Sequence, residues 1–110
     1  MDSQVRAKKA RMRLEAVVAS PPTSKCQMTI EMMEKIVQLY PDQLRLDIYY
    51  DGIEPAVAPT RSYILSDKYK VLPSSFVNGN MVSAAKVPDP EDLRQEIEKE
   101  LRKGEEAWLQ

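Results

Sequence analysis

The chain has 110 residues, a hydrophobic content of 43% and a formal net charge of −1, a composition that fits one globular domain with a modest core. With one cysteine and no histidine, it cannot form an internal disulfide, a Cys–His or Ser–His pair, or the usual zinc ligand sets, so we expect no metal and no cofactor. The sequence shows no membrane span, no signal pattern and no basic excess, which predicts a cytoplasmic protein without a membrane or nucleic-acid partner.

The start of the chain is polar and locally basic. Its cationic side chains are Arg6, Lys8, Lys9, Arg11 and Arg13. Residues 1–12 predict a solvated arm or a short helix face, with a nucleic-acid contact as the alternative. A folded domain is expected over residues 13–103, followed by a tail over 104–110 in which Trp108 has no predicted position.

The first two elements are a strand and a helix. Residues 13–20, RLEAVVAS, are rich in small and β-branched side chains and stop at a Pro-Pro pair, which predicts a short buried strand. From the cysteine onward, apolar side chains recur at steps of three and four, at Cys26, Ile30, Met33, Val37 and Tyr40. This spacing predicts an amphipathic helix that ends at Pro41.

A second strand and a connector follow. Residues 43–52 alternate apolar side chains with polar or aromatic ones and end at Asp51-Gly52, as a strand does. The next stretch begins as a proline-containing loop. Residues 60–69 fit either a short irregular helix or an extra strand, and the pattern does not separate the two. Four tyrosines are expected to line the packing surface of this connector: Tyr49, Tyr50, Tyr63 and Tyr69.

A hairpin and a helix close the domain. Residues 74–84 are two apolar runs around Asn78-Gly79, a pair that supplies the positive φ angles of a type I′ turn. Asp89 is the expected N-cap of the last helix and Gly104 its terminator. Its apolar stripe is Leu93, Ile97 and Leu101.

Two sets of residues in these elements are expected to be structural. One is a solvated acidic helix face, paired with Arg94, Lys99 and Arg102 and made of Glu91, Asp92, Glu96, Glu98 and Glu100. The other is a set of methionines that fill the core, namely Met28, Met32, Met33 and Met81.

The order of elements predicts an α/β fold. A strand–helix–strand unit favours a parallel pair joined by a right-handed crossover, and the hairpin would extend that sheet antiparallel. Helices would then cover the faces of a mixed sheet of about four strands, giving a small three-layer sandwich.

This arrangement resembles the thioredoxin-like fold over residues 13–103. The segment TSKC, residues 23–26, stands where that family carries its Cys-x-x-Cys motif, and the helix and strand that follow match in length and spacing. The segment VLPSSFVNGNMV, residues 71–82, resembles the family's cis-proline and hairpin. The resemblance implies that Pro73 is cis and lies beside the 23–26 loop.

The departure from the family motif bears on chemistry. Where the family has its attacking cysteine this chain has Thr23, whose hydroxyl cannot form a mixed disulfide. Cys26 matches the resolving cysteine, which the family shields. Thr23 or Ser24 is the expected helix N-cap, with an anion site formed with Lys25 as the alternative.

Three interpretations of Cys26 stay open. A position in the first helical turn beside Lys25 would lower the pKa of the thiol, whereas burial would raise it. Cys26 is therefore either a buried structural residue, a monothiol that forms mixed disulfides, or half of a disulfide between two copies. No oligomeric state follows from the sequence.

The leading functional hypothesis is a thioredoxin-like module that binds a protein or peptide and lacks dithiol chemistry. Its binding surface would be Thr23, Ser24, Lys25, Cys26, Leu72, Pro73 and Ser74. Strand-like pairing with an extended peptide needs no thiol. The alternative is an atypical single-cysteine thiol–disulfide oxidoreductase that uses Cys26 as its catalytic residue with glutathione or another thiol. A third possibility is a trap variant of an active enzyme, in which Thr23→Cys would restore disulfide reduction.

Overall fold

The computed structural model describes residues 11–66 and 71–109, which form a four-stranded sheet, three α-helices and a short 3-10 helix. In chain order the elements are β1 (Met12–Val18), α1 (Ser24–Gln38), β2 (Leu44–Tyr50), α2 (Arg61–Leu65), β3 (Ser74–Val77), β4 (Asn80–Ala84), α3 (Pro90–Leu101) and η2 (Glu105–Ala107). The fold is thus α/β with a mixed sheet, in agreement with the expected class. No helix among the described residues is long and apolar enough to cross a membrane.

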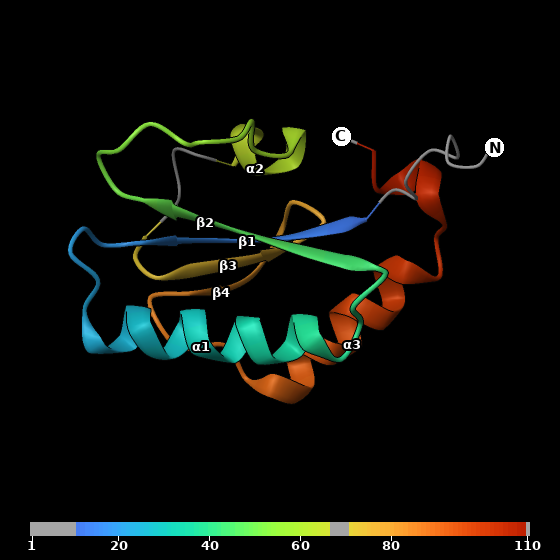
Figure 1. Ribbon diagram of the computed structural model, residues 1–110, viewed down its shortest axis with the longest axis horizontal. Helices are drawn as coiled ribbons and strands as arrows, with labels where there is room; N and C mark the ends of the chain where they lie inside the picture. The colour runs from blue at the N-terminus through green and yellow to red at the C-terminus, as the bar shows by residue number, and fades with distance from the viewer. Residues whose placement is uncertain (1–10, 67–70, 110) are drawn as a thin grey trace, which may run out of the picture.

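The sheet has the order β2-β1-β3-β4, so the first strand of the chain lies near its centre (Figure 1). β1 pairs with β2 in parallel, from Met12 opposite Leu44 to Val18 opposite Tyr50. On its other side β1 pairs with β3 antiparallel, and β3 continues into β4 through a hairpin. A strand–helix–strand unit extended by a hairpin gives this topology.

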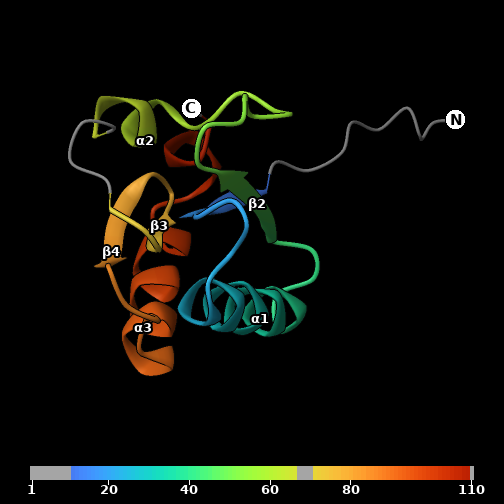
Figure 2. The same cartoon turned by 90° about the vertical axis from the view of Figure 1, so that its left-hand side faces the viewer.

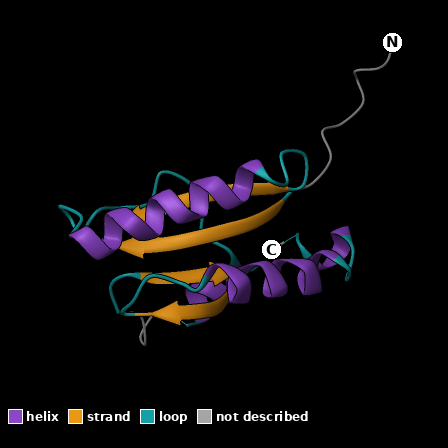
Figure 3. Ribbon diagram, turned by 90° about the horizontal axis from the view of Figure 1, so that it is seen from below, coloured by secondary structure: helices purple, strands orange, loops and turns teal. Residues whose placement is uncertain are grey.

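Helices cover the two faces unequally. α1 packs on β1 and β2, whereas α3 packs on β3 and β4, so that both lie on one face of the sheet (Figures 1 and 3). The opposite face carries the 51–59 connector and the short α2 (Figure 2). The molecule is therefore a three-layer arrangement in which one outer layer is thin.

Each face has its own apolar cluster, because alternate residues of a strand point to opposite sides. The cluster beneath α1 and α3 contains Met12, Leu14, Ala16, Met33, Ile36, Leu44, Val77, Leu93, Ile97 and Trp108. The cluster beneath α2 is smaller, with Val17, Tyr49, Tyr63 and Phe76 at its centre. In it the Tyr63 ring meets the rings of Tyr49 and Phe76 edge to face, with centroids 4.9 and 4.8 Å apart.

The structure confirms several element boundaries that local signals in the sequence predict. Asn78 and Gly79 have φ angles of 51° and 82°, the positive values that the hairpin turn requires. Asp89 caps α3 by accepting hydrogen bonds from the backbone N–H groups of Glu91 and Asp92. After α3 the chain turns at Gly104, whose φ is 93°.

The C-terminal segment packs on the domain. Trp108 is buried in the larger cluster, and its indole N–H donates to the Glu100 carbonyl oxygen at 3.0 Å. Glu100 is buried as well, so its assignment to the solvated face of α3 was wrong. The Glu100 carboxylate accepts from Asn78 Nδ2 and from Lys103 Nζ, both at 2.9 Å. The Glu100 carboxylate can be buried because these two donors replace the hydrogen bonds that it would otherwise make with water.

Other expectations were also wrong in part. Met28 is 56% exposed and Met81 40% exposed, so of the four methionines only Met33 is fully buried and Met32 partly. In β2 the apolar alternation predicted for residues 43–52 runs through Ile48 to Tyr50, yet the buried ring is Tyr49. Of the two alternatives left open for residues 60–69, the short helix is the one found, as α2 over Arg61–Leu65. Most of the basic arm, and also Tyr69, lies outside the described residues.

Candidate functional site

The residues singled out in the sequence gather at one end of the sheet. β1 ends there at Val18, α1 begins at Ser24 and β3 begins at Ser74, as Figure 1 shows at the left of the view. Because β1 and β3 are antiparallel neighbours, the end of one lies beside the start of the other. The 23–26 loop and the 72–74 segment therefore share this edge of the molecule.

Cys26 lies inside this end rather than on its surface. The residue is 1% exposed. Its sulfur accepts a hydrogen bond from the backbone N–H of Ala19 at 3.4 Å, while its own N–H donates to Thr23 Oγ1 at 3.2 Å. The thiol thus connects the residue that follows β1 to the first turn of α1.

These contacts have opposing effects on the thiol. Burial raises the pKa of Cys26, and the hydrogen bonds from Thr23 and from the Ala19 backbone lower it, with a net pKa below the ordinary value. A buried thiol with stabilising donors is less basic than a free one but is closed to collision with an external disulfide. Its pKa alone therefore does not make it a nucleophile.

Thr23 is the N-cap of α1, as expected for one of the two candidates. Its extended backbone, with φ −77° and ψ 176°, turns the side chain oxygen toward the free N–H of Cys26. Thr23, Ser24 and Lys25 are all exposed. The loop therefore presents two hydroxyl side chains and one ammonium group to solvent.

The 72–74 segment is held from two sides. The carbonyl oxygen of Pro73 accepts from the N–H of Ala85 at 2.7 Å, and the Ser74 hydroxyl donates to the carbonyl oxygen of Val71. Pro73 and Ser74 are buried, whereas Leu72 is only partly so. The Leu72–Pro73 peptide bond is cis, and so is Ser20–Pro21, which the sequence did not indicate.

Leu72 has backbone groups that the sheet leaves unused. The register that pairs Leu14 with Val77 and Val17 with Ser74 would place Ala19 opposite Leu72 if the ladder continued. Instead, Ala19 gives its N–H to the Cys26 sulfur. Within residues 11–66 and 71–109, no hydrogen bond joins the N–H or C=O of Leu72 to another residue. An extended chain laid along Leu72 could take up both groups.

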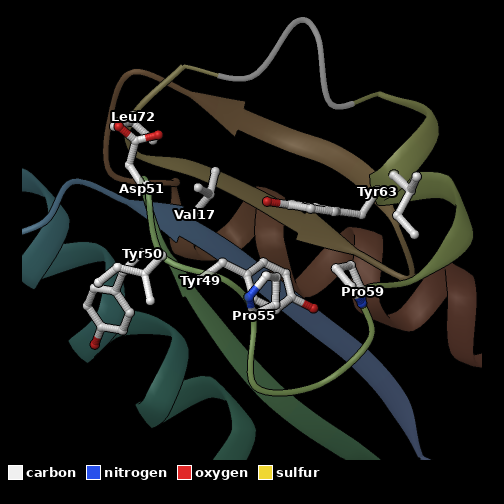
Figure 4. Close-up of a pocket in the computed structure, with 11 residues that line it drawn as sticks. Val17, Tyr49, Tyr50, Asp51, Pro55, Pro59, Tyr63 and Leu72 are labelled. Carbon is white, nitrogen blue, oxygen red and sulfur yellow. The ribbon is translucent and has the colours of Figure 1, made fainter.

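A pocket of about 630 Å³ lies next to this edge, on the face opposite α1 (Figure 4). Its walls come from the ends of β1 and β2, the 51–59 connector, α2 and Leu72. The lining residues are Val17, Tyr49, Tyr50, Asp51, Gly52, Ile53, Pro55, Pro59, Tyr63, Ile64 and Leu72. Tyr49, Tyr50 and Tyr63 border the connector, as expected, but no local pattern in the sequence marks a pocket between them.

A buried carboxylate supports the floor of that pocket. Glu15 is 0% exposed and accepts hydrogen bonds from Tyr49 Oη at 2.6 Å, Thr60 Oγ1 at 2.6 Å and the Thr60 N–H at 2.8 Å. Burial and this carboxylate raise the pKa of the Tyr49 phenol far above its ordinary value. Tyr49 therefore stays neutral and serves as a fixed wall rather than a base.

The described part of the chain shows no group of three or more Cys, Asp or Glu side chains that could hold a metal ion. A comparison of the chain with protein-family models and with curated proteins finds no match.

Proposed function

We propose that this chain is a thioredoxin-like module that binds an extended protein or peptide segment at the edge formed by residues 23–26 and Leu72-Pro73. The observation that carries the proposal is the pair of backbone groups on Leu72 that no described residue hydrogen-bonds, at the point where β1 leaves the sheet. An extended segment would add a short strand there, since main-chain hydrogen bonds supply affinity without any reaction.

The motif residues support binding rather than dithiol chemistry. Thr23 uses its side-chain oxygen to cap α1, and a threonine has no thiolate with which to attack a disulfide. Cys26 is buried and bonded to Ala19 N–H. The exposed groups of the loop are hydroxyl and ammonium groups, which suit hydrogen bonding to a partner.

A peptide array followed by an NMR titration tests this function. Labelled protein is screened against blocked eight-residue peptides, and the best binder is titrated into ¹⁵N-labelled protein. We expect amide shifts concentrated in residues 19–26 and 71–74. N-methylation of the peptide amide that pairs with Leu72 removes one ladder hydrogen bond and should weaken binding about tenfold.

Variants of the loop complete the test. Ser24→Glu places a charge at the proposed edge and should reduce binding, whereas Lys35→Glu changes an exposed side chain in the last turn of α1 and should not. If no peptide binds, or if binding ignores both Ser24→Glu and N-methylation, the proposal is wrong.

One observation favours a second function, that of a monothiol oxidoreductase, namely the lowered pKa of Cys26. Such an enzyme needs the sulfur to reach glutathione or another thiol partner. The rate of Cys26 alkylation against pH separates the two functions. Rapid reaction of the folded protein with a midpoint near neutrality would favour the enzyme, and resistance until unfolding would favour the binding module.

A further inference from the structure

The pocket beside Leu72 lies where a side chain of a bound segment would point. Opposite residues of an antiparallel pair project to the same face of the sheet, and successive residues alternate. Leu72 packs with the cluster of Val17, Tyr49, Tyr63 and Phe76, so its side chain is on the α2 face. A peptide residue opposite Leu72 therefore projects into the pocket of about 630 Å³, a size typical of ligand sites.

The charge of the lining sets what this side chain can be. Among the described residues that line the pocket, Asp51 is the one with a formal charge; it is exposed and makes no ion pair with another described residue. Arg13, a described cation on this face, is already bonded to Asp47 at 2.9 Å and lies 3.9 Å from Glu15. Among the described residues of the lining, the pocket thus offers one negative charge without an ion-pair partner, that of Asp51.

The walls suit an apolar stem that ends in a cation. Tyr49 and Tyr63 are fixed at 61° to each other with centroids 4.9 Å apart, and Figure 4 shows Tyr63 reaching across the pocket toward Val17. Both rings are almost fully buried, so they offer the pocket a narrow apolar wall for the stem rather than an open stacking face. Exposed Ile53 and the prolines of the connector add apolar surface for methylene groups.

We infer that the pocket selects an arginine or lysine side chain from the extended segment that pairs with Leu72. The inference rests on the proposed peptide-binding function and names its preferred partner: a segment with a basic residue flanked by extended chain. Asp51 receives the charge at the mouth, and the tyrosine rings line the stem. A glutamate at the same peptide position would face Asp51 and be disfavoured.

A matched peptide series tests the inference. Four blocked peptides, Ac-Ser-Val-Thr-X-Thr-Val-Ser-NH2 with X as arginine, lysine, norleucine or glutamate, are titrated into ¹⁵N-labelled protein. The arginine and lysine peptides should bind about threefold to fivefold more tightly than the norleucine peptide, as a partly exposed ion pair allows, and the glutamate peptide should bind most weakly. Their shifts should include residues 49–53 and Tyr63.

Asp51→Asn should remove the preference for a basic residue, so that the arginine, lysine and norleucine peptides bind with similar affinity. Asp42→Asn, at an exposed aspartate in the turn before β2, is the matched control and should preserve the preference for a basic residue. If Asp51→Asn fails to fold, Ile53→Lys places a positive charge on the same rim that offsets the charge of Asp51, and should remove the preference for the arginine peptide over the glutamate peptide.

The outcomes separate the two proposals. Equal binding of all four peptides, with shifts at Leu72, overturns the basic-residue preference and leaves strand pairing supported. A preference that survives Asp51→Asn also overturns the inference, because the charge would then act elsewhere. Absence of binding by every peptide, including the array-selected one, contradicts the peptide-binding function itself.

Discussion

Glu15 and Thr60 are joined by two hydrogen bonds, 2.6 Å from the hydroxyl group and 2.8 Å from the backbone N–H, across 45 positions of sequence. The pair ties the connector before α2 to the central strand. Because Glu15 is completely buried, each donor that it loses leaves part of a charge without a partner. The position of the pocket wall therefore depends on this contact.

We expect Thr60→Val to lower the free energy of unfolding by about 1–3 kcal/mol, since it removes a hydroxyl donor to a buried carboxylate while keeping the volume. Thr60→Ser keeps the hydroxyl and should cost about half as much or less. Urea denaturation followed by far-ultraviolet circular dichroism measures both. A smaller loss for Thr60→Val than for Thr60→Ser would show that the methyl group, and not the hydrogen bond, matters.

A second prediction concerns the cap of α1. Thr23→Ala removes the acceptor for the Cys26 N–H, which should cost about 1 kcal/mol of stability. The same variant should raise the pKa of Cys26, because the hydrogen bond from Thr23 lowers it. Thr23→Ser should restore both properties. The ultraviolet absorbance of the thiolate against pH gives the midpoint, and an unchanged midpoint in Thr23→Ala would contradict the assignment.

A third prediction concerns the C-terminal segment. Trp108 fills part of the core beneath α3 and bonds to the Glu100 carbonyl oxygen. Trp108→Ala should lower the free energy of unfolding by about 3–5 kcal/mol. Trp108→Phe retains most of the ring but loses the N–H donor, and should cost about 1–2 kcal/mol. Thermal unfolding of both variants provides the measurement; a loss below about 1 kcal/mol for the alanine variant would place the side chain outside the core.

The pH dependence of stability should include a contribution from Glu100. Burial raises the pKa of this carboxyl group, but the hydrogen bonds from Asn78 and Lys103 lower it by more than burial raises it. The folded pKa therefore lies below the ordinary value. Its stabilising contribution is fully present above the unfolded-chain pKa of about 4.3 and is lost as the pH falls through the folded pKa.

Glu100→Gln should therefore be less stable than the parent protein at neutral pH, by about 1–3 kcal/mol, and the gap should narrow in acid. Glu106→Gln, at an exposed position of η2, is the control and should show a much smaller gap. Urea midpoints measured from neutral pH down to about pH 3, below that unfolded-chain value, make the comparison. A gap that is constant with pH would mean that the folded carboxyl group is not stabilised in its charged form.

Local patterns predicted most of the elements, because each signal is read within one turn or one strand. Asn78-Gly79 defines its turn without reference to the rest of the chain, and the Asp89 cap is equally local. The α1 stripe was predicted from its spacing. The boundaries of β1 and β2 differed by one or two residues, since strand ends depend on the neighbour with which they pair.

What the sequence did not reveal depends on distant partners. Nothing near Glu15 marks it as buried, because its donors, Tyr49 and Thr60, are 34 and 45 positions away. Glu100 is different, since it follows Leu93 and Ile97 at steps of four and three and thus lies on their stripe. That spacing alone places Glu100 on the inner face of α3, although a charged side chain is usually exposed.

In the candidate site, too, some residues could be assigned from local sequence and others only from contacts between distant segments. Thr23 and Cys26 could be assigned to the start of α1 from the sequence. The unused groups of Leu72, however, follow from the register of β1 against β3, and the pocket needs the path of the 51–59 connector as well. The Asp51-Gly52 pair predicts the end of a strand, and nothing in the neighbouring sequence indicates that Asp51 lines a pocket.

The central position of β1 also bears on how the domain assembles during synthesis. Its parallel partner β2 emerges from the ribosome first, but its antiparallel partner, β3, begins only at Ser74. Until then the nascent sheet carries an open, apolar edge of the kind that recruits other strands. Delaying translation between β2 and β3 should therefore increase aggregation, or dependence on chaperones, more than a pause placed after β4.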